Sequence, residues 1–586
     1  MSHHLISVAR RHYFLLLIFL TCCSLLTRIL FLNSLPSELH RDEANIAYNA
    51  YSILKTGKDE HGKSYPVIFE SFGDYKLPVM VYLTEVSIAL KGLEPGVVRV
   101  PNALLATLLI PAFFGLSYEL FKRKQTALCA SAVLTFSVWH TFLARTIYEP
   151  IAGLTFSTIG LYFLLKARHS SVWFIPAALF FLIACFTYNL PMLFIPLIVV
   201  ASALIFRKEY HLHSLQKFSG FLLVGVAFLI PFLITLPLAQ QKSGATLFSN
   251  QQLLDESQAN FAALIRQRVP YKISVVLTNR YSTGLTQFVA NYAAVWNPQY
   301  LFIKGNDNPW HSLQLIRVGS FHWGAIPFIL IGMLLLIRRA PKWSKSELLI
   351  LIYLLFSPVI NSLTLDSPNT NRLMDFHLAV TLILAIGLSW TIDQLRFSKN
   401  RQIKVFLCLL IGYYLMSWSN AMMKYTLLHS SHLDIKWHEG VEKASQTLAP
   451  LLTDVDIIYV DASNLPDYYL LYTEFAFYTK LDPQVFQNTA QWDKQFSFLA
   501  PHQFANYRMI LPFKIDNLTN VDTTQYFPPG VNTVIFVKRL SPSDTISSYH
   551  TAIINNYKGE PIWEVAKVTK QEIEDRLHPA VLLKKK

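Results

Sequence analysis

The sequence predicts a polytopic α-helical membrane protein with about 11 transmembrane helices and a C-terminal extracytoplasmic α/β domain. Three observations support this fold class. The 586 residues are 52% hydrophobic and only 15% charged, with a mean hydropathy of +0.33, which lies outside the range of soluble globular proteins. Long apolar runs recur throughout residues 1–425. Residues 426–586 contain short strand-like and helix-like segments instead.

A membrane-crossing helix needs about 20 mostly apolar residues. The stretches that meet this length are 13–35, 100–121, 125–143, 150–166, 172–189, 190–206, 217–237, 320–337, 346–364, 377–394 and 403–423. The first stretch can cross a bilayer and is followed by bulky polar residues rather than a small-residue cleavage site. We therefore do not expect it to be a cleaved signal peptide.

Clusters of Lys and Arg between the apolar runs set the predicted orientation. They lie at 10–11, 122–124, 166–168, 207–208, 338–339 and 396–404, and all fall on one side of the membrane. The positive-inside rule makes that side cytoplasmic, so the N-terminus is predicted inside and the tail outside a plasma or inner membrane. This clustering also argues against nucleic acid as a partner, despite the net charge of +14.

One apolar stretch is ambiguous. Residues 77–90 are too short to span and contain Glu85, and counting them as a crossing would move the basic cluster 122–124 to the outside. We therefore predict a helix at the outer surface or a re-entrant helix. The outer segments are then 36–99, 238–319 and 365–376.

The predicted domains are 1–425, a transmembrane domain, and 426–586, the outer α/β domain. In the tail, residues 456–460, 533–537 and 563–568 resemble strands, and 438–452 resembles a helix. All five cysteines lie inside apolar runs, and their spacing matches neither a disulfide framework nor a metal site.

Charged residues collect on the predicted outer face, close to the membrane. Carboxylates can deprotonate an acceptor hydroxyl, while Lys and Arg can bind a phosphate and stabilise the charge that develops on it. A site with both suggests transfer of a group from a phosphate-bearing lipid. The acids are Asp42, Glu43, Asp74 and Glu149, and the cations are Arg41, Lys76, Arg99, Arg145 and Arg372, with His311 beside them.

Each of these residues also has a structural interpretation. Asp42 and Glu43 could cap a helix over residues 44–55. Glu149 precedes Pro150 and could begin the next helix. The other acids and cations could form exposed ion pairs or interfacial anchors, although cations are unusual on the outer side of a membrane protein.

The order of short motifs resembles that of the GT-C glycosyltransferases, specifically the protein O-mannosyltransferase and aminoarabinose-transferase relatives. The resemblance covers roughly residues 1–425. Two positions depart from the family pattern: Glu149 stands where relatives often carry Asp, and Trp310 stands where they carry Arg. The matching segments are Asp42-Glu43, 72–78, 99–102, 144–149, 305–312 and Asn371-Arg372.

The resemblance implies a GT-C fold and an inverting displacement at the anomeric carbon of a sugar, with polyprenyl phosphate departing. Asp42 would act as general base or orient the acceptor, and Glu43 would support it. The donor would be a polyprenyl-phosphate-linked sugar, expected to be a hexose, and the acceptor a protein, lipid or glycan of the cell envelope. The substrate-binding residues would be Asp74, Lys76, Arg99, Arg145, Glu149, His311 and Arg372.

We do not expect a metal to be required, because the mannosyltransferase-like members of this family do without one. Asp42, Glu43 and Glu149 nonetheless carry oxygen ligands of the kind that Mg²⁺ or Mn²⁺ prefers, so a divalent cation is the one cofactor left open.

Three other functions stay open. A lipid-linked oligosaccharide transferase or ligase would use the same residues with a larger donor. The number of spans would also suit a lipid-glycan transporter or flippase, but transport favours ionisable residues in mid-span, and these spans contain few apart from Arg28 and Glu119. A non-catalytic scaffold that displays the tail is the third alternative.

Overall fold

The computed structural model describes residues 2–211, 214–241, 247–307, 312–340, 342–429, 437–465, 467–495, 498–509, 526–544, 546–556 and 558–573; the side chains of 2–11, 237–241, 494–495 and 498 are outside this description. The chain forms two compact units. Unit 1 comprises Met1–Leu30 and Val100–His429, and unit 2 comprises Phe31–Arg99 and Ser430–Lys586.

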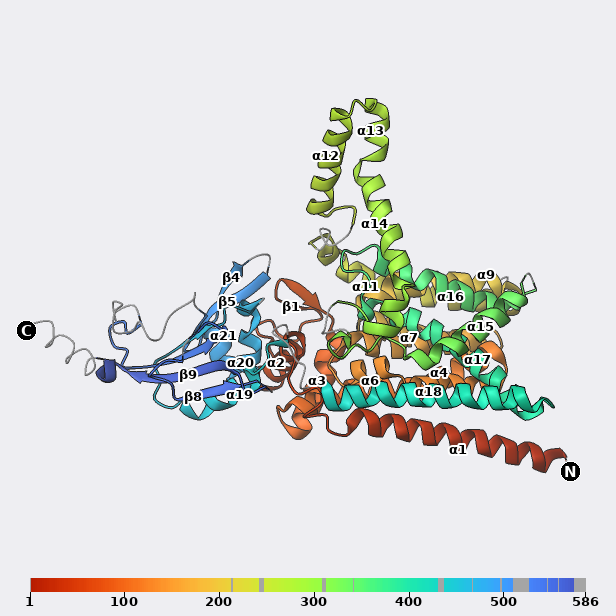
Figure 1. The fold of residues 1–586 in the computed structure, drawn as a ribbon, viewed down its shortest axis with the longest axis horizontal. Coiled ribbons are helices and arrows are strands. Elements are labelled where there is room, and N and C mark those ends of the chain that lie inside the picture. Colours follow the sequence, from red (N-terminus) through yellow and green to blue (C-terminus); the bar gives the residue numbers. More distant parts are fainter. Residues whose placement is uncertain are drawn as a thin grey trace, which may run out of the picture. The chain divides into compact units, whose positions relative to one another are not determined.

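Unit 1 is helical (Figure 1). Its main helices are α1 (Ser2–Ile29), α4 (Pro95–Phe121, which starts in unit 2), α5 (Lys124–Thr135), α6 (Val138–Ala144), α7 (Glu149–Lys166), α8 (Phe174–Cys185), α9 (Asn189–Ile205), α11 (Leu215–Gln241), α12 (Gln251–Arg266), α13 (Tyr271–Leu277), α14 (Arg280–Val295), α15 (Ile326–Arg338), α16 (Lys345–Ser362), α17 (Met374–Phe397) and α18 (Arg401–Leu428). Short turns of helix between them include α10 (Arg207–Tyr210), η3 (Gln299–Lys304) and η6 (Thr370–Arg372).

Every predicted apolar stretch overlaps one of these helices, and the chain is a multi-pass membrane protein. Among the described residues, six helices are long and apolar enough to cross a membrane, or seven if a bent pair counts as one crossing. The count of about 11 crossings stays a prediction. The six are His12–Ile29, Pro95–Phe121, Leu215–Leu236, Lys345–Ser362, Met374–Phe397 and Arg401–Leu428.

The third predicted span is broken into two helices, α5 and α6, and the chain bends by 57° between them. A helix end leaves carbonyl groups without intrahelical partners, and inside a membrane these must bond to protein. Arg28 of α1, fully buried, donates to the carbonyls of Leu134 and Thr135, both at 3.3 Å, and its Nη2 lies 2.6 Å from His140 Nδ1. Arg28, the single charged residue of the first predicted span, therefore supplies hydrogen bonds to carbonyl groups at this break.

Unit 2 is built on a seven-stranded mixed sheet of order β4-β5-β6-β3-β7-β9-β8. The central strand β3 is parallel to β6 and β7, and the other pairs are antiparallel. The strands are β3 (Ile457–Asp461), β4 (Gln491–Gln495), β5 (Phe498–Phe504), β6 (Tyr507–Met509), β7 (Thr533–Arg539), β8 (Ala552–Asn555) and β9 (Pro561–Thr569), and the helices of the tail are α19 (Val441–Leu448), α20 (Tyr472–Tyr478) and α21 (Pro483–Thr489). The predicted strands and helix of the tail are confirmed as β3, β7, β9 and α19.

The first predicted outer segment packs into the same unit. It forms α2 (Arg41–Thr56), the hairpin β1 (Phe69–Ser71) and β2 (Asp74–Lys76), and α3 (Pro78–Lys91). Tyr48 and Phe72 belong to the apolar core shared with the tail helices. Tyr48 packs edge-on against Phe486 with ring centroids 5.5 Å apart, and Phe72 packs against Tyr472 at 5.9 Å. Because these side chains are buried together, the segment and the tail fold as one core.

A buried carboxyl lies within this core. Glu60, 1% exposed, accepts hydrogen bonds from Asn45 Nδ2 at 2.8 Å, Asn49 Nδ2 at 3.2 Å and Tyr472 Oη at 3.2 Å. Burial raises the pKa of Glu60 to about 8, and the two amide bonds offset only part of that rise. The folded state therefore holds a proton that the unfolded chain releases near pH 4.5.

We expect Glu60→Gln to flatten the dependence of stability on pH. Between pH 4.5 and about 8 the folded state binds the extra proton, so wild-type stability falls as pH rises, by at most about 1.4 kcal/mol per pH unit from this group. The measurement is Tm from pH 5 to 9 for both proteins. The exposed Glu560→Gln is the control and should keep the wild-type slope; an unchanged slope in Glu60→Gln would contradict the prediction.

Candidate functional site

The first turn of α2 carries the adjacent acids. His40 is the N-cap, and its Nδ1 accepts from the amide of Asp42 at 3.3 Å. Glu43 Oε2 accepts from the amide of His40 at 3.0 Å, which completes a capping box. The helix ends at Gly57, whose φ of +70° suits glycine. The capping interpretation is confirmed for Glu43, while Asp42 lies in the first turn of the helix and contributes its backbone amide to the cap rather than its carboxylate.

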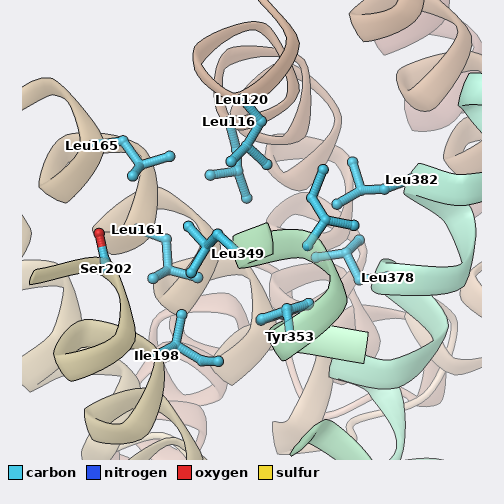
Figure 2. A pocket seen from close by; sticks show the side chains of 11 residues that line it. Leu116, Leu120, Leu161, Leu165, Ile198, Ser202, Leu349, Tyr353, Leu378 and Leu382 are labelled. Carbon is cyan, nitrogen blue, oxygen red and sulfur yellow. The ribbon is translucent and has the colours of Figure 1, made fainter. Parts of the chain in front are cut away.

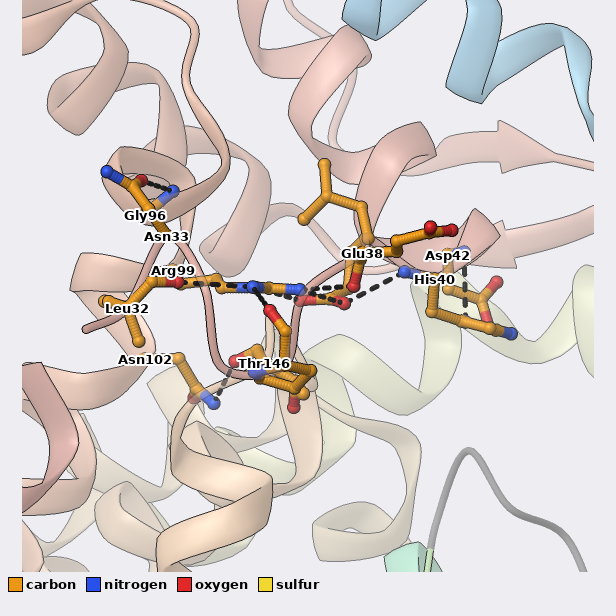
Figure 3. A network of polar contacts seen from close by, with 12 residues as sticks. Leu32, Asn33, Glu38, His40, Asp42, Gly96, Arg99, Asn102 and Thr146 are labelled. Carbon is orange, nitrogen blue, oxygen red and sulfur yellow. Dashed lines mark hydrogen bonds and ion pairs between the residues drawn. The ribbon is translucent and has the colours of Figure 1, made fainter. Parts of the chain in front are cut away.

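Glu43 forms a buried ion pair with Arg99, and Figure 3 shows the contacts made by the Arg99 guanidinium. Arg99 Nε lies 3.0 Å from Glu43 Oε1 and its Nη2 lies 3.2 Å from Oε2, with both side chains fully buried. The same guanidinium donates to the carbonyls of Leu32, Pro36 and Glu38 at 3.2, 2.7 and 2.7 Å. Arg99 therefore joins the start of α4 to the chain that leads into α2, and the pair has a structural role.

Asp42 forms the second ion pair, and this one is partly exposed. Its Oδ1 lies 3.1 Å from Lys76 Nζ, with side-chain exposures of 24% and 17%. Burial by itself would raise the pKa of Asp42, but the positive charge of Lys76, followed by those of His40 and Arg41, holds that pKa well below its ordinary value. Asp42 is therefore ionised throughout the neutral range.

A tight hairpin presents Lys76. Strands β1 and β2 pair with Phe69 opposite Lys76, and the two turn residues, Phe72 and Gly73, have φ of +59° and +75°. Positive φ at both central positions is typical of a type I′ turn, in which glycine is favourable and phenylalanine is strained. Burial of the Phe72 ring in the core of unit 2 offsets this strain.

Asp74 begins β2 and is exposed. Its Oδ1 accepts from the amide of Tyr75 at 2.6 Å. Arg41, which sequence reasoning placed among the outer cations, pairs with Asp467 of the tail. Unit 2 therefore brings Asp42 to Lys76 and Glu43 to Arg99, and it places the charge of Arg41 close enough to act on Asp42.

The other predicted residues lie in unit 1. Arg145 follows α6, is 2% exposed, and donates from Nη1 to the carbonyl of Thr27 at 2.8 Å. Glu149 is the first residue of α7 and is followed by proline, as the structural interpretation predicted. His311 lies outside the described residues.

Arg372 lies in η6 and donates from Nη1 to Thr364 Oγ1 at 2.8 Å. The same nitrogen pairs with Asp366. Sequence reasoning missed Asp366 and also His40, the N-cap beside Asp42. Their positions in the chain were the available signal, since Asp366 lies in the same short predicted outer segment as Arg372, and only Arg41 separates His40 from the acidic pair.

Solved structures provide the comparison that bears on the fold. ArnT from Cupriavidus metallidurans bound to undecaprenyl phosphate is 14% identical, with 94% of this chain and 97% of that chain covered and a TM-score of 0.50. The archaeal oligosaccharyltransferase AglB from Archaeoglobus fulgidus, with an inhibitory peptide and a dolichol-phosphate, is 12% identical, with 90% and 69% covered and a TM-score of 0.50. Both belong to the GT-C superfamily. This chain has the GT-C fold.

The A. fulgidus oligosaccharyltransferase tethered to an acceptor peptide matches at 12% identity and a TM-score of 0.49, and the chain spans 63% of its length and 80% of its own. No protein-family model and no curated protein sequence matches the chain. At these identities the likeness concerns the fold, and the GT-C resemblance predicted from the motifs is confirmed at that level.

The acids of the predicted site differ in whether they could bind a metal ion. Both oxygens of Glu43 accept bonds, from Arg99 and from the amide of His40, so this carboxylate does not fit as a ligand. Within the described ranges, no group of three or more His, Cys, Asp or Glu side chains could hold a metal ion.

A small apolar cavity of about 30 Å³ lies within unit 1, among α4, α7, α9, α16 and α17 (Figure 2). Apart from Ser202 and Tyr353, the described lining residues are aliphatic. The cavity therefore suits a hydrocarbon group and not a charged group. The lining residues are Leu116, Leu120, Leu161, Leu165, Ile198, Ser202, Leu349, Ile350, Tyr353, Leu378 and Leu382.

Proposed function

We propose that this protein is a membrane glycosyltransferase that moves a sugar from a polyprenyl-phosphate donor to an acceptor at the outer face of a plasma or inner membrane. The ion pair between Asp42 and Lys76 carries the proposal, because it sets an ionised carboxylate 3.1 Å from an ammonium group in a partly exposed position. The GT-C fold supports it, since structures with this fold contain undecaprenyl phosphate and dolichol-phosphate.

In the proposed reaction, Asp42 accepts the proton of the acceptor hydroxyl as the acceptor oxygen attacks the anomeric carbon. The bond from that carbon to the phosphate oxygen breaks, and the polyprenyl phosphate leaves with its electron pair. Attack opposite the leaving group inverts the configuration. Lys76 binds the phosphate and stabilises the charge that develops on it.

The pair also links donor binding to base strength. With Lys76 at 3.1 Å, Asp42 is charged but is a weak base, because its pKa is low. A donor phosphate that draws Lys76 away removes the largest stabilising charge, so the pKa of Asp42 rises and the carboxylate becomes a better proton acceptor. The base is thus strengthened when the donor is present.

The remaining predicted residues complete the proposed site. Glu43 and Arg99 position the first turn of α2 through their buried pair. The other proposed contacts to donor or acceptor are Asp74, Arg145, Glu149, His311 and Arg372. The transmembrane domain is proposed to include 1–425, with residues 426–586 extracytoplasmic.

A larger donor is the second candidate, because one solved structure with the same fold is an oligosaccharyltransferase. The catalytic residues would be the same, and the size of the sugar would be read by the surrounding loops. A divalent cation that acts on the donor phosphate would bind Asp42 or Glu149, since Glu43 is fully engaged.

Transfer of labelled sugar tests the proposal. Purified protein in lipid vesicles is incubated with radiolabelled polyprenyl-phosphate hexoses, or with a lipid-linked oligosaccharide, plus membrane extracts as the acceptor source. Label in a protein, lipid or glycan fraction establishes the transferase and names the acceptor class. If label instead crosses the vesicle without leaving its lipid, the protein is a transporter and the proposal fails.

A further inference from the structure

A helical hairpin projects from unit 1. It consists of α12, α13 and α14, and its base is held to α16 and the loop after it. Asn291 Nδ2 donates to the carbonyls of Ser362 at 3.1 Å and Thr364 at 2.9 Å, and Tyr292 Oη donates to the carbonyl of Leu355 at 2.9 Å. The base is therefore fixed, and the rest of the hairpin extends away from it (Figure 1).

Side-chain contacts hold together the part of the hairpin that is far from its base. Asn279 caps α14, accepting from the amides of Tyr281 at 2.9 Å and Ser282 at 3.0 Å. The rings of Phe261 and Tyr271 pack edge-on at 5.8 Å, which joins α12 to α13. Ser257 of α12 donates to the carbonyl of Thr278. The two arms are thus tied together near the tip.

Several large apolar side chains of this hairpin are exposed and not buried. On α14, residues 281, 285 and 289 repeat every four positions and so share one side of the helix. Their exposures are 64, 58 and 58%, and Val276 at the tip is 67% exposed. We call the set the hairpin face: Tyr271, Ile273, Val276, Leu277, Tyr281, Leu285 and Val289, all exposed. Large apolar side chains exposed together on one projecting element are typical of an interaction site.

Positive charge surrounds the tip of the hairpin. Residues 266–280 contain four cations and no acid. The cations are Arg266, Arg268, Lys272 and Arg280, all exposed, and the Arg280 guanidinium lies 5.0 Å from the Tyr281 ring centroid. Apolar and aromatic side chains beside Lys and Arg are typical of helices that lie in a membrane interface, where cations meet lipid phosphates.

The direction of the hairpin is the one expected of an element that lies along a membrane surface. Figure 1 shows α12–α14 projecting sideways from the helical unit, crosswise to α1 and α18. Both of those helices are long and apolar enough to cross a membrane. A hairpin that runs crosswise to membrane-crossing helices lies along the plane of the bilayer, so one of its sides faces lipid headgroups.

We propose that the hairpin face docks on the outer leaflet of the surrounding membrane and that its four cations bind the phosphates of anionic lipids. The apolar side chains insert at the boundary between headgroups and acyl chains, and the cations lie at the level of the phosphates. The proposal is independent of the transferase chemistry, since none of these residues belongs to the proposed site.

The test measures contact between the hairpin and acyl chains in the full chain. Val276→Cys, in a background with the five native cysteines replaced, is labelled with an environment-sensitive fluorophore and reconstituted into phosphatidylcholine vesicles with or without phosphatidylglycerol. The matched control is Ala259→Cys, which is exposed on α12 outside the hairpin face. Lipids with a spin label on the acyl chain then quench any fluorophore that reaches them.

We expect severalfold stronger quenching at position 276 than at 259, and a further increase with phosphatidylglycerol. Arg268→Gln combined with Lys272→Gln should remove only that increase. Equal quenching at both positions overturns the proposal. A blue-shifted emission at 276 without quenching also overturns it, because the face is then covered by protein, such as a second copy. If quenching is the same with and without phosphatidylglycerol, the proposal that the four cations bind anionic lipid is overturned.

Discussion

Asp42→Asn is expected to lower the rate of sugar transfer by about 10²- to 10⁴-fold, the contribution typical of a positioned proton acceptor. Asparagine keeps the shape of the side chain and its place in the first turn of α2, but it cannot take a proton. It also leaves Lys76 without its carboxylate at 3.1 Å. The measurement is the initial rate of label transfer in vesicles at saturating donor.

Asp454→Asn is the matched control, because Asp454 is exposed in a turn of the same unit, away from the proposed site. It should transfer sugar at the wild-type rate. Lys76→Met should weaken donor binding and also reduce the rate. Full activity in Asp42→Asn, with the variant folded, would remove Asp42 from the mechanism and leave it only its ion pair with Lys76 in the first turn of α2.

Arg99→Met is expected to destabilise unit 2 by about 3–5 kcal/mol, because it leaves the Glu43 carboxylate buried without its cation. It also removes the donors to three backbone carbonyls that Arg99 satisfies. For a unit of this size the loss corresponds to a fall in Tm of roughly 10 °C. Hydrogen exchange followed by mass spectrometry, on peptides from residues 31–99 and 437–573, locates the change in unit 2.

Lys480→Met gives the comparison for an exposed ion pair in the same unit. Lys480 lies 2.7 Å from Glu94, but both side chains are more than half exposed, so its loss should cost less than about 1 kcal/mol. Adding Glu43→Gln to Arg99→Met should recover part of the loss by removing the buried charge. If Arg99→Met melted like Lys480→Met, the buried pair would not be what holds this segment.

The helices of unit 1 were predictable because the signal is local. A run of apolar residues favours a helix wherever lipid surrounds it, since no other backbone form satisfies its own hydrogen bonds there. The third predicted span shows the limit of that argument. At its break, residues 136–137, the carbonyls of Leu134 and Thr135 accept hydrogen bonds from Arg28, which lies far away in sequence.

The candidate site divides in the same way. The capping role of Glu43 and the place of Asp42 in the first turn could be predicted, because an N-cap and its third residue are neighbours in the chain. The partners could not: Lys76 reaches Asp42 only through the tight turn at Phe72 and Gly73, and Glu43 meets Arg99 only after the chain returns into α4. Sequence position alone assigned Arg41 to the outer cations, and its pairing with Asp467 appears only in the folded unit.

The sequence by itself determined that this is a membrane protein of apolar helices with a strand-containing tail, because composition and periodicity act over a few residues at a time. The resemblance to the GT-C fold came separately, from the order of the family's motifs. The tertiary structure decided that the segment 31–99 shares a core with the tail, through Tyr48 and Phe72, and which acid meets which cation. Those contacts join residues far apart in the chain. Burial of apolar surface favours them, and it depends on proximity in space and not on separation in the sequence.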